Sequence, residues 1–216
     1  MFSHPQSLAS KLRLAKLTSL SALVASSAAF VVASGHARPT ARVVELTLTA
    51  APSRLSLVPG ESTDVFAYNG QVPGPTLEFR EGDHVVIHFH NDLPEATTIH
   101  WHGLHIPAAM DGSPLEPVKP GGTFDYIFDV LPGSAGTYWY HPHPDRDAGY
   151  QVAKGLYGAI IIRAAGHPLA AIPEKLLVLS DNRFLPGGNL DLPPPDSPQG
   201  EIDEENGREG PVLFVN

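Results

Sequence analysis

The sequence is made largely of short runs in which apolar and polar residues alternate, and this alternation restricts the fold more than any other feature. Successive side chains of a β-strand point to opposite faces, so alternation is typical of strands with one buried face. In residues 42–49, for example, Val44, Leu46 and Leu48 would share that face. Further runs of this kind span residues 64–69, 84–90, 123–130, 136–141 and 155–163.

Segments rich in glycine and proline separate these runs. They read VPGPT at 72–76, REGD at 80–83, KPGG at 119–122 and LPGSAG at 131–136. Short strands punctuated in this way predict an all-β protein, either a sandwich or a barrel. The only helix that we expect is a short one near residues 147–155.

The character of the sequence changes after residue 165. Residues 174–184 predict one more strand, and residues 211–216 begin another. Between them, residues 185–210 are rich in proline, glycine and acidic residues, which is typical of a long loop or linker. We therefore expect one β domain over residues 42–165. Residues 166–216 would form a linker and the incomplete start of a second β domain.

The N-terminal segment has the pattern of a secretory signal peptide. Residues 1–37 contain basic residues but no acidic one, and residues 17–37 have no charged side chain. Gly35 and Ala37 are the small residues that signal peptidases require before a cleavage site. The alternative is a membrane anchor, against which the serines of this segment argue. We expect cleavage after Ala37 and export to the periplasm or the extracellular medium.

The charge and the cysteine content exclude some classes of function. The formal net charge is −9, and all 23 acidic residues follow residue 37. Such a chain should repel nucleic acid and anionic membrane surfaces. The chain has no cysteine, so no disulfide can stabilise it and its stability must come from its core.

Two H-x-H pairs are the strongest functional signal in the sequence. His100 and His102 lie in TTIHWHGLH, and His141 and His143 lie in TYWYHPHP. In an extended chain the two histidines of a pair share one face, while Trp101 points to the other. Two neighbouring strands would then present four imidazoles to one place. Imidazole suits copper and zinc, so the sequence predicts a metal site.

The other histidines carry a weaker signal. His84, His88 and His90 would share one face of the strand predicted at 84–90, and a second metal site there remains open as an alternative. His105 follows the first pair by three residues, and it either supports that site or merely lies near it.

Several motifs together resemble the first cupredoxin domain of a multicopper oxidase of the laccase type. They are VPGPTLEFREGD (72–83), HWHGLH (100–105), DGSP (111–114), KPGGTFDYIFDV (119–130), GTYWYHPH (136–143) and GLYGAIIIR (155–163). The resemblance implies a Greek-key, plastocyanin-like β-sandwich. It continues more loosely through LVLSDNRF (177–184) and GPVLFVN (210–216), which resemble the opening of the second cupredoxin domain. The chain therefore resembles the N-terminal part of such an oxidase.

The resemblance also implies roles for individual residues. His100 resembles the ligand of the type 2 copper, and His102, His141 and His143 resemble ligands of the binuclear type 3 pair. Asp111 resembles the acidic residue that helps proton delivery during oxygen reduction, and its spacing after HWHG favours this role over the alternative, an ordinary Asp-Gly turn. The two tryptophans of these motifs, at 101 and 139, are expected to be packing residues.

The sequence departs from the family in one large respect. Multicopper oxidases receive electrons at a type 1 copper held by a cysteine, and their last domain supplies four more cluster histidines. This sequence has no cysteine and no H-x-H after residue 143. We expect half of a trinuclear site, completed by missing cupredoxin domains or a partner chain, which would couple an unknown reducing substrate to dioxygen. The alternatives are an exported, non-catalytic copper-binding module and an inactive truncated product.

Overall fold

The computed structural model describes residues 41–168 and 171–216 of the chain. The predicted signal peptide, residues 1–37, lies outside the described residues. Within the described ranges, no helix has the length and apolar character that a membrane span needs. The described residues belong to one compact unit.

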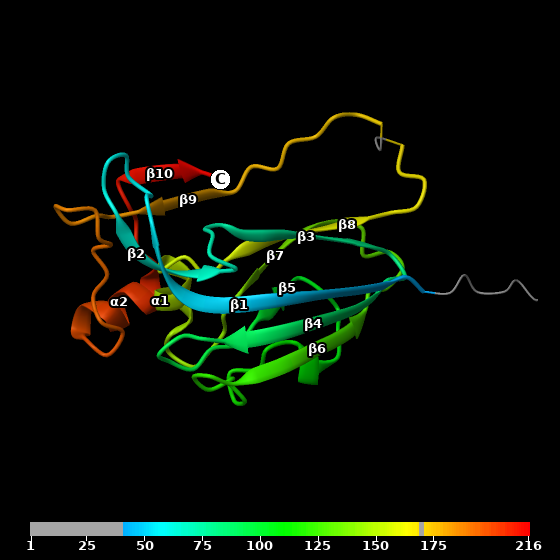
Figure 1. Cartoon of the computed structure of the whole chain (residues 1–216), viewed down its shortest axis with the longest axis horizontal. Helices are drawn as coiled ribbons and strands as arrows, with labels where there is room; N and C mark the ends of the chain where they lie inside the picture. Colours follow the sequence, from blue (N-terminus) through cyan, green and yellow to red (C-terminus); the bar gives the residue numbers. More distant parts are fainter. Residues whose placement is uncertain (1–40, 169–170) are drawn as a thin grey trace, which may run out of the picture. The chain divides into compact units, whose positions relative to one another are not determined.

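Two four-stranded sheets face each other, as predicted for a β-sandwich (Figure 1). In spatial order, the first sheet contains β2 (Thr63–Tyr68), β1 (Val43–Leu55), β4 (His84–Asn91) and β6 (Thr123–Asp129). The second contains β3 (Gly74–Arg80), β8 (Gly158–Arg163), β7 (Gly136–His141) and β5 (His100–His102). The pairs β1–β4 and β3–β8 are parallel, and the other neighbours are antiparallel. The predicted strands are therefore confirmed.

The core lies between the two sheets. Its largest side chain, Trp101 of β5, is fully buried against Tyr126, Phe128 and Tyr140. Full burial of an aromatic or branched aliphatic side chain contributes about 1.5–3 kcal/mol. The indole nitrogen of Trp101 donates a hydrogen bond to the Met110 carbonyl at 3.0 Å. Trp101 is thus a packing residue, as expected from the sequence.

Two strands differ from the prediction. β3 was not predicted because its residues lie between two turn segments, yet Leu77 and Phe79 are buried and Glu78 is exposed. β1 continues past residue 49 to Leu55, because its second half leaves β4 and pairs with β2. Small residues and a proline hide the alternation there.

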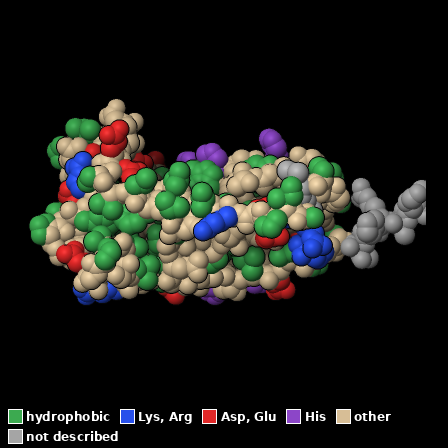
Figure 2. Space-filling model, turned by 90° about the horizontal axis from the view of Figure 1, so that it is seen from above, with side chains coloured by type: hydrophobic (Ala, Val, Ile, Leu, Met, Phe, Trp, Pro, Cys, Tyr) green, Lys and Arg blue, Asp and Glu red, His purple; other side chains and the backbone are tan. Residues whose placement is uncertain are grey.

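Beyond residue 168 the described chain adds β9 (Leu179–Asn182) and β10 (Val212–Val215), which form a separate antiparallel pair. Both strands were predicted. Figure 2 views the side of the molecule that carries them, and hydrophobic side chains gather on it. Leu179, Leu213 and Val215 are each more than half exposed on these strands.

The prediction of a continuous loop over residues 185–210 is wrong, because helix α2 spans Pro198–Asn206. The side chain of Ser197 accepts a hydrogen bond from the backbone N–H of Gly200 at 3.1 Å and so caps the helix. Pro198 occupies the first helical position, where its missing N–H costs nothing. Gly207 ends the helix with a φ of 74°. The proline-rich composition concealed this start signal.

The part after residue 168 is hydrogen-bonded to the sandwich at several points. The Tyr157 hydroxyl donates to Ser180 at 2.9 Å, and the buried Thr63 hydroxyl donates to the Gly188 carbonyl at 2.7 Å. Glu204 of α2 accepts hydrogen bonds from the backbone N–H of Gly149, at 3.0 and 3.2 Å, in the predicted helix α1 (Ala148–Ala153).

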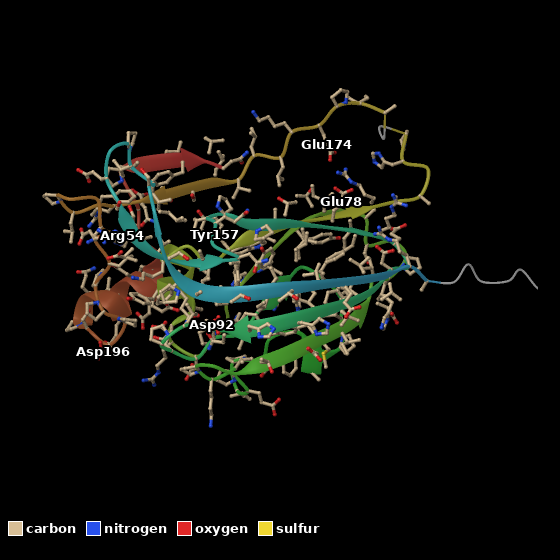
Figure 3. The ribbon with its side chains drawn as sticks, viewed as in Figure 1. Arg54, Glu78, Asp92, Tyr157, Glu174 and Asp196 are labelled. Atoms are coloured by element: carbon tan, nitrogen blue, oxygen red, sulfur yellow. The ribbon has the colours of Figure 1, made fainter. Side chains whose placement is uncertain are left out.

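An ion pair adds a further connection at the end of β8. Arg163 bonds to Glu78 of β3 at 3.1 Å and also to Glu174 (Figure 3). In Figure 3, Glu78 and Glu174 lie on facing segments. The hydrogen bonds that the Arg163 guanidinium donates to Glu174 and Glu78 raise the pKa of Arg163.

His84, His88 and His90 of β4 lie on the outer face of the first sheet, and the first two are paired with carboxylates. His84 contacts Asp129 at 2.7 Å. His88 lies between two carboxylates, with Asp125 of β6 at 2.8 Å from Nδ1 and Glu45 of β1 at 2.8 Å from Nε2. The three β4 histidines do not gather their ligand atoms into one cluster. Their pairing with carboxylates therefore accounts for His84 and His88 without a second metal site.

The buried Asp83 fixes the turn before β4. Its carboxylate accepts hydrogen bonds from the Arg80 backbone N–H at 2.7 Å and from the guanidinium of Arg42, and these bonds lower its pKa. We predict that Asp83→Asn lowers the free energy of unfolding at pH 7 by about 1–2 kcal/mol. A lowered pKa stabilises the fold above the unfolded value, near 3.9, and this gain is lost as pH falls through the folded value.

Urea denaturation at several pH values measures this effect. The two proteins should differ at pH 7 and converge in acid. Asp64→Asn is the matched control, because the Arg54–Asp64 pair is exposed and its atoms are 3.7 Å apart, so its loss should change stability little. A difference for Asp83→Asn that persists unchanged to low pH would contradict the assignment.

The two carboxylates around His88 should hold its imidazole in the protonated form. Glu45, then Asp125, raise the pKa of His88. Its contribution to stability is therefore present below the ordinary histidine pKa, near 6.5, and is lost as pH rises through the raised value. An NMR titration of the His88 ring should give a pKa that falls in the double variant Glu45→Gln, Asp125→Asn. An unchanged pKa in that variant would refute the assignment.

Candidate metal centre

The pairing of β5 with β7 brings the two H-x-H motifs together. The antiparallel register sets His100 opposite His141, Trp101 opposite Tyr140 and His102 opposite Trp139. Because alternate residues share a face, His100, His102 and His141 all project from the same side of the sheet. Trp101 and Tyr140 project from the other side into the core, where both are fully buried.

Three of the four predicted ligands converge. A ligand nitrogen of each of His100, His102 and His141 lies within 4.8 Å of the other two. The closest approach joins Nδ1 of His102 to Nε2 of His141 at 3.2 Å. Two nitrogens that bind one metal ion at about 2.0 Å with tetrahedral angles lie about 3.3 Å apart. The spacing of this pair therefore fits a shared metal ion without rearrangement of the backbone.

The hydrogen bonds of the rings indicate where their protons lie. Nδ1 of His100 is 3.0 Å from the Asp111 carbonyl, and Nδ1 of His141 is 2.8 Å from the Pro142 carbonyl. A carbonyl only accepts, so both Nδ1 atoms carry the proton and both Nε2 atoms are unprotonated, with a lone pair that can accept a hydrogen bond or bind a metal ion. In the metal-free chain, His102 then donates from Nδ1 to Nε2 of His141. A metal ion shared by this pair would require the His102 proton to move to its other nitrogen.

Burial makes His141 suited to bind metal at neutral pH. The residue is 8% exposed, and burial together with the nearby imidazoles lowers the pKa of His141 to about 4. A neutral imidazole is the form that ligates. In contrast, His102 and His143 are exposed and His100 is partly exposed, so the cluster opens to solvent on one side.

His143 lies beside the other three rings rather than within their cluster. Its ring centroid is 5.4 Å from that of His100 and 6.1 Å from that of His141. The backbone N–H of His143 donates to the Thr98 hydroxyl at 2.8 Å, which fixes the segment after β7 against the residues that precede β5.

Asp111 lies next to His100. One oxygen of its carboxylate is 3.1 Å from Nδ1 of His100, although the proton there is directed to the backbone carbonyl of Asp111. This oxygen is buried and has no hydrogen-bond partner. The turn is tight as well, because a side chain at Gly112 would collide with the Ile99 carbonyl. A buried carboxylate oxygen without a partner is costly unless a ligand or water completes it.

His105 is exposed on the segment between β5 and the short 3₁₀ helix Ala108–Met110, and it is not part of the cluster.

Three residues of the site were not found by sequence reasoning. Thr98 anchors His143, as described above. The fully buried Gln151 of α1 accepts from the Thr97 hydroxyl at 2.7 Å and donates to Glu95 at 2.8 Å, so the helix holds the residues before β5. Trp139, expected only to be a packing residue, is 38% exposed and stacks on His141. For Gln151, the only signal in the sequence is that a polar residue lies in the predicted short helix.

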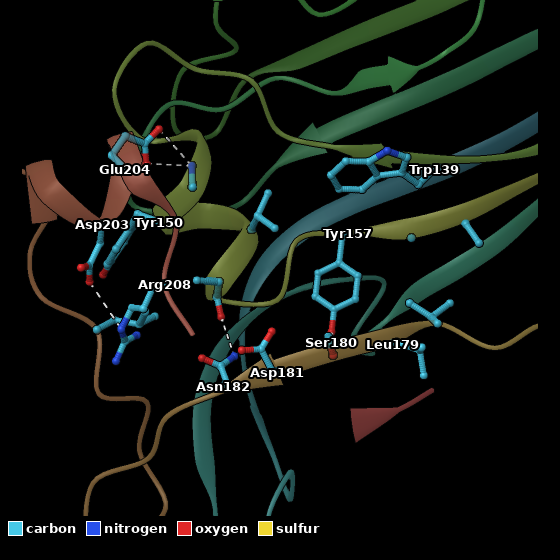
Figure 4. Close-up of a pocket in the computed structure, with 18 of the residues that line it drawn as sticks. Trp139, Tyr150, Tyr157, Leu179, Ser180, Asp181, Asn182, Asp203, Glu204 and Arg208 are labelled. Atoms are coloured by element: carbon cyan, nitrogen blue, oxygen red, sulfur yellow. Dashed lines mark hydrogen bonds and ion pairs between the residues drawn. The ribbon is translucent and has the colours of Figure 1, made fainter. Parts of the chain in front are cut away.

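A groove of about 570 Å³ lies on the face of the second sheet that also carries the histidine cluster (Figure 4). The groove is lined by Trp139 of β7, by Tyr157 just before β8 and by Leu179 of β9. Asp203 of α2 and Arg208, two residues after the end of α2, line its other side. Its polar side chains are engaged with one another, as in the ion pair of Arg208 with Asp203 at 3.4 Å. Trp139 is thus shared between the groove and the histidine cluster.

Comparison with known proteins agrees with the resemblance found in the motifs. A family model described as multicopper oxidase matches residues 50–167. The chain is 41% identical over 173 residues to multicopper oxidase mco of Staphylococcus aureus, covering 79% of this chain and 37% of that protein. It is 41% identical over 128 residues to copper resistance protein A of Escherichia coli, covering 57% of this chain and 20% of that protein.

Solved structures give the same result. A multicopper oxidase from Campylobacter jejuni, described as a metallo-oxidase, matches with a TM-score of 0.73 and 40% identity over 80% of this chain and 36% of that one. The predicted cupredoxin-like β-sandwich is therefore confirmed. The chain spans less than two-fifths of the length of these relatives. More than half of its sequence matches the family model, and the chain belongs to the multicopper oxidase family.

Proposed function

We propose that this chain supplies half of the histidine ligands of a trinuclear copper site in an oxidase. That oxidase would oxidise a reducing substrate and reduce dioxygen to water. One observation supports this proposal above all others: Nδ1 of His102 and Nε2 of His141 lie 3.2 Å apart, beside His100, at a spacing that suits one shared metal ion. Imidazole donors suit copper, and copper is the metal of the family.

The proposed roles follow the family pattern. His100 would bind the type 2 copper, while His102, His141 and His143 would bind the type 3 pair. When bound, copper would accept single electrons and deliver them to dioxygen. The chain's own contribution is to orient the rings, since the Asp111 and Pro142 carbonyls hold the protons of His100 and His141 on Nδ1.

We assign Asp111 to proton supply in the proposed reaction. Its unpartnered, buried oxygen next to His100 supports this role, because such an oxygen can accept a hydrogen bond from water. The simpler explanation, an Asp-Gly turn, accounts for Gly112 but leaves this carboxylate oxygen without a partner.

The rest of the oxidase would come from outside this sequence. A thiolate-held copper must receive electrons in the family, and this sequence has no cysteine. We propose that residues 42–165 are a first cupredoxin domain and that residues 166–216 are a linker and the start of a second. Further cupredoxin domains or a partner chain would complete the cluster. We also propose export, with cleavage after Ala37.

A second candidate function is an exported copper-binding module without catalysis. The absence of cysteine favours it, because the histidine cluster can bind a metal ion while no thiolate is present to receive electrons.

Copper titration tests the ligand assignment. We predict that the purified chain binds Cu(II) at pH 7 and that the double variant His102→Ala, His141→Ala loses at least tenfold in affinity, measured by isothermal titration calorimetry. The matched control is His84→Ala, His88→Ala, which removes two histidines from the outer face of the first sheet and should leave the affinity unchanged. A loss of affinity in the control alone would contradict the assignment.

Spectroscopy and turnover separate the two candidate functions. We predict that the copper-loaded chain lacks the intense visible absorption of a copper–thiolate bond and does not oxidise a phenolic dye. The dye should be oxidised only when domains with the missing ligands are added or fused. A blue, active preparation of this chain alone would refute the proposal that it is half of a site, and inactivity after fusion would favour the binding module.

A further inference from the structure

Trp139 occupies the fourth corner of a square of side chains whose other three corners are histidines. On the face that β5 and β7 share, His100 lies opposite His141, and His102 lies opposite Trp139. Three of these residues bring their ligand atoms together, and the fourth is an indole. The sequence offers no hint of this arrangement, because the register between the two strands creates it.

The indole is in contact with two of the three imidazoles. Its ring centroid is 4.0 Å from that of His141, with an angle of 25° between the planes, which is a stacked arrangement. It is 5.0 Å from the ring of His102 at 33°. His100 differs, because its ring meets those of His102 and His141 edge-on, at 71° and 77°. Trp139 therefore acts on the close pair and not on His100.

His102 depends on this contact more than His141 does. His141 is buried, and the Pro142 carbonyl holds its Nδ1. His102 is exposed on β5, a three-residue strand at the edge of its sheet. The hydrogen bond from its Nδ1 goes to His141, and a metal ion that took both lone pairs would replace that bond. The tilted contact with the Trp139 ring would remain to restrict rotation of the His102 ring.

We infer that Trp139 is a positioning residue, which holds His102 and His141 in the orientation that lets both bind one copper ion. The inference rests on the proposed copper-binding function. The competing explanation is that Trp139 only lines the groove between the sheet, β9 and α2. The two explanations differ in what they require of the side chain: positioning requires a flat ring, whereas lining the groove requires only apolar volume.

The test compares three variants by calorimetric Cu(II) titration and by electron paramagnetic resonance of the bound ion. Trp139→Leu should weaken Cu(II) binding about tenfold, the size of loss typical when a residue that supports metal ligands is removed. Its resonance lines should broaden, because the rings adopt more than one orientation. Trp139→Phe keeps a flat ring and should restore most of the affinity. Tyr157→Leu removes an aromatic ring from the same groove away from the histidines and should bind as the parent chain does.

Each result has a defined meaning. Parent-like affinity and line shape in Trp139→Leu would overturn the inference, as would equal losses in Trp139→Leu and Tyr157→Leu. If Trp139→Leu does not fold, Trp139→Phe is compared with Trp139→Met, which has similar volume but no flat ring. Equal binding by those two would also overturn it. Failure of the parent chain to bind Cu(II), or insensitivity to His102→Ala, His141→Ala, would instead refute the proposed function.

Discussion

The register between β5 and β7 is the constraint on which the rest of the site depends. Side chains alternate along both strands, so a slip of the edge strand β5 by one residue would turn His100 and His102 to the opposite face. The same slip would expel Trp101 from the core, where it is fully buried beside Tyr140 of β7. The burial of two large aromatic rings on one face thus fixes the position of the imidazoles on the other. Core packing and metal chemistry are specified by the same pairing.

Hydrogen bonds from the surrounding residues hold the segments that carry the histidines in the positions set by the register. The short strand β5 contributes few backbone hydrogen bonds, and side chains around it supply additional ones. Gln151 bonds to the residues before β5, Thr98 holds the segment after β7, and the Asp111 turn fixes the ring of His100. As a result, solvent exposure increases from the buried His141 to the exposed His102 and His143. The buried member is held by the fold, and the exposed members are open to solvent.

The sequence predicts those features that depend on local pattern. Alternation identified most strands and the burial of Trp101, and the two H-x-H motifs identified the residues that converge. Features that depend on pairing were not predictable. Trp139 meets His102 only across the strand register, and β3 was hidden between turns. Helix α2 is not predicted for a different reason: the proline and acidic residues around it are typical of a loop, although Ser197 and Pro198 mark a helix start.

The bond between Glu204 and the first turn of α1 has a consequence for how such a protein can be recombined. Glu204 accepts from Gly149, Gln151 in the same helix bonds to Thr97, and the next residue, Thr98, bonds to His143. A carboxylate far along the sequence therefore stands at one end of a chain of contacts that ends at a histidine of the cluster. A β-sandwich that was moved into a relative without α2 would lose the hydrogen bonds between Glu204 and Gly149. An exchange that keeps these contacts has to move α2 together with α1.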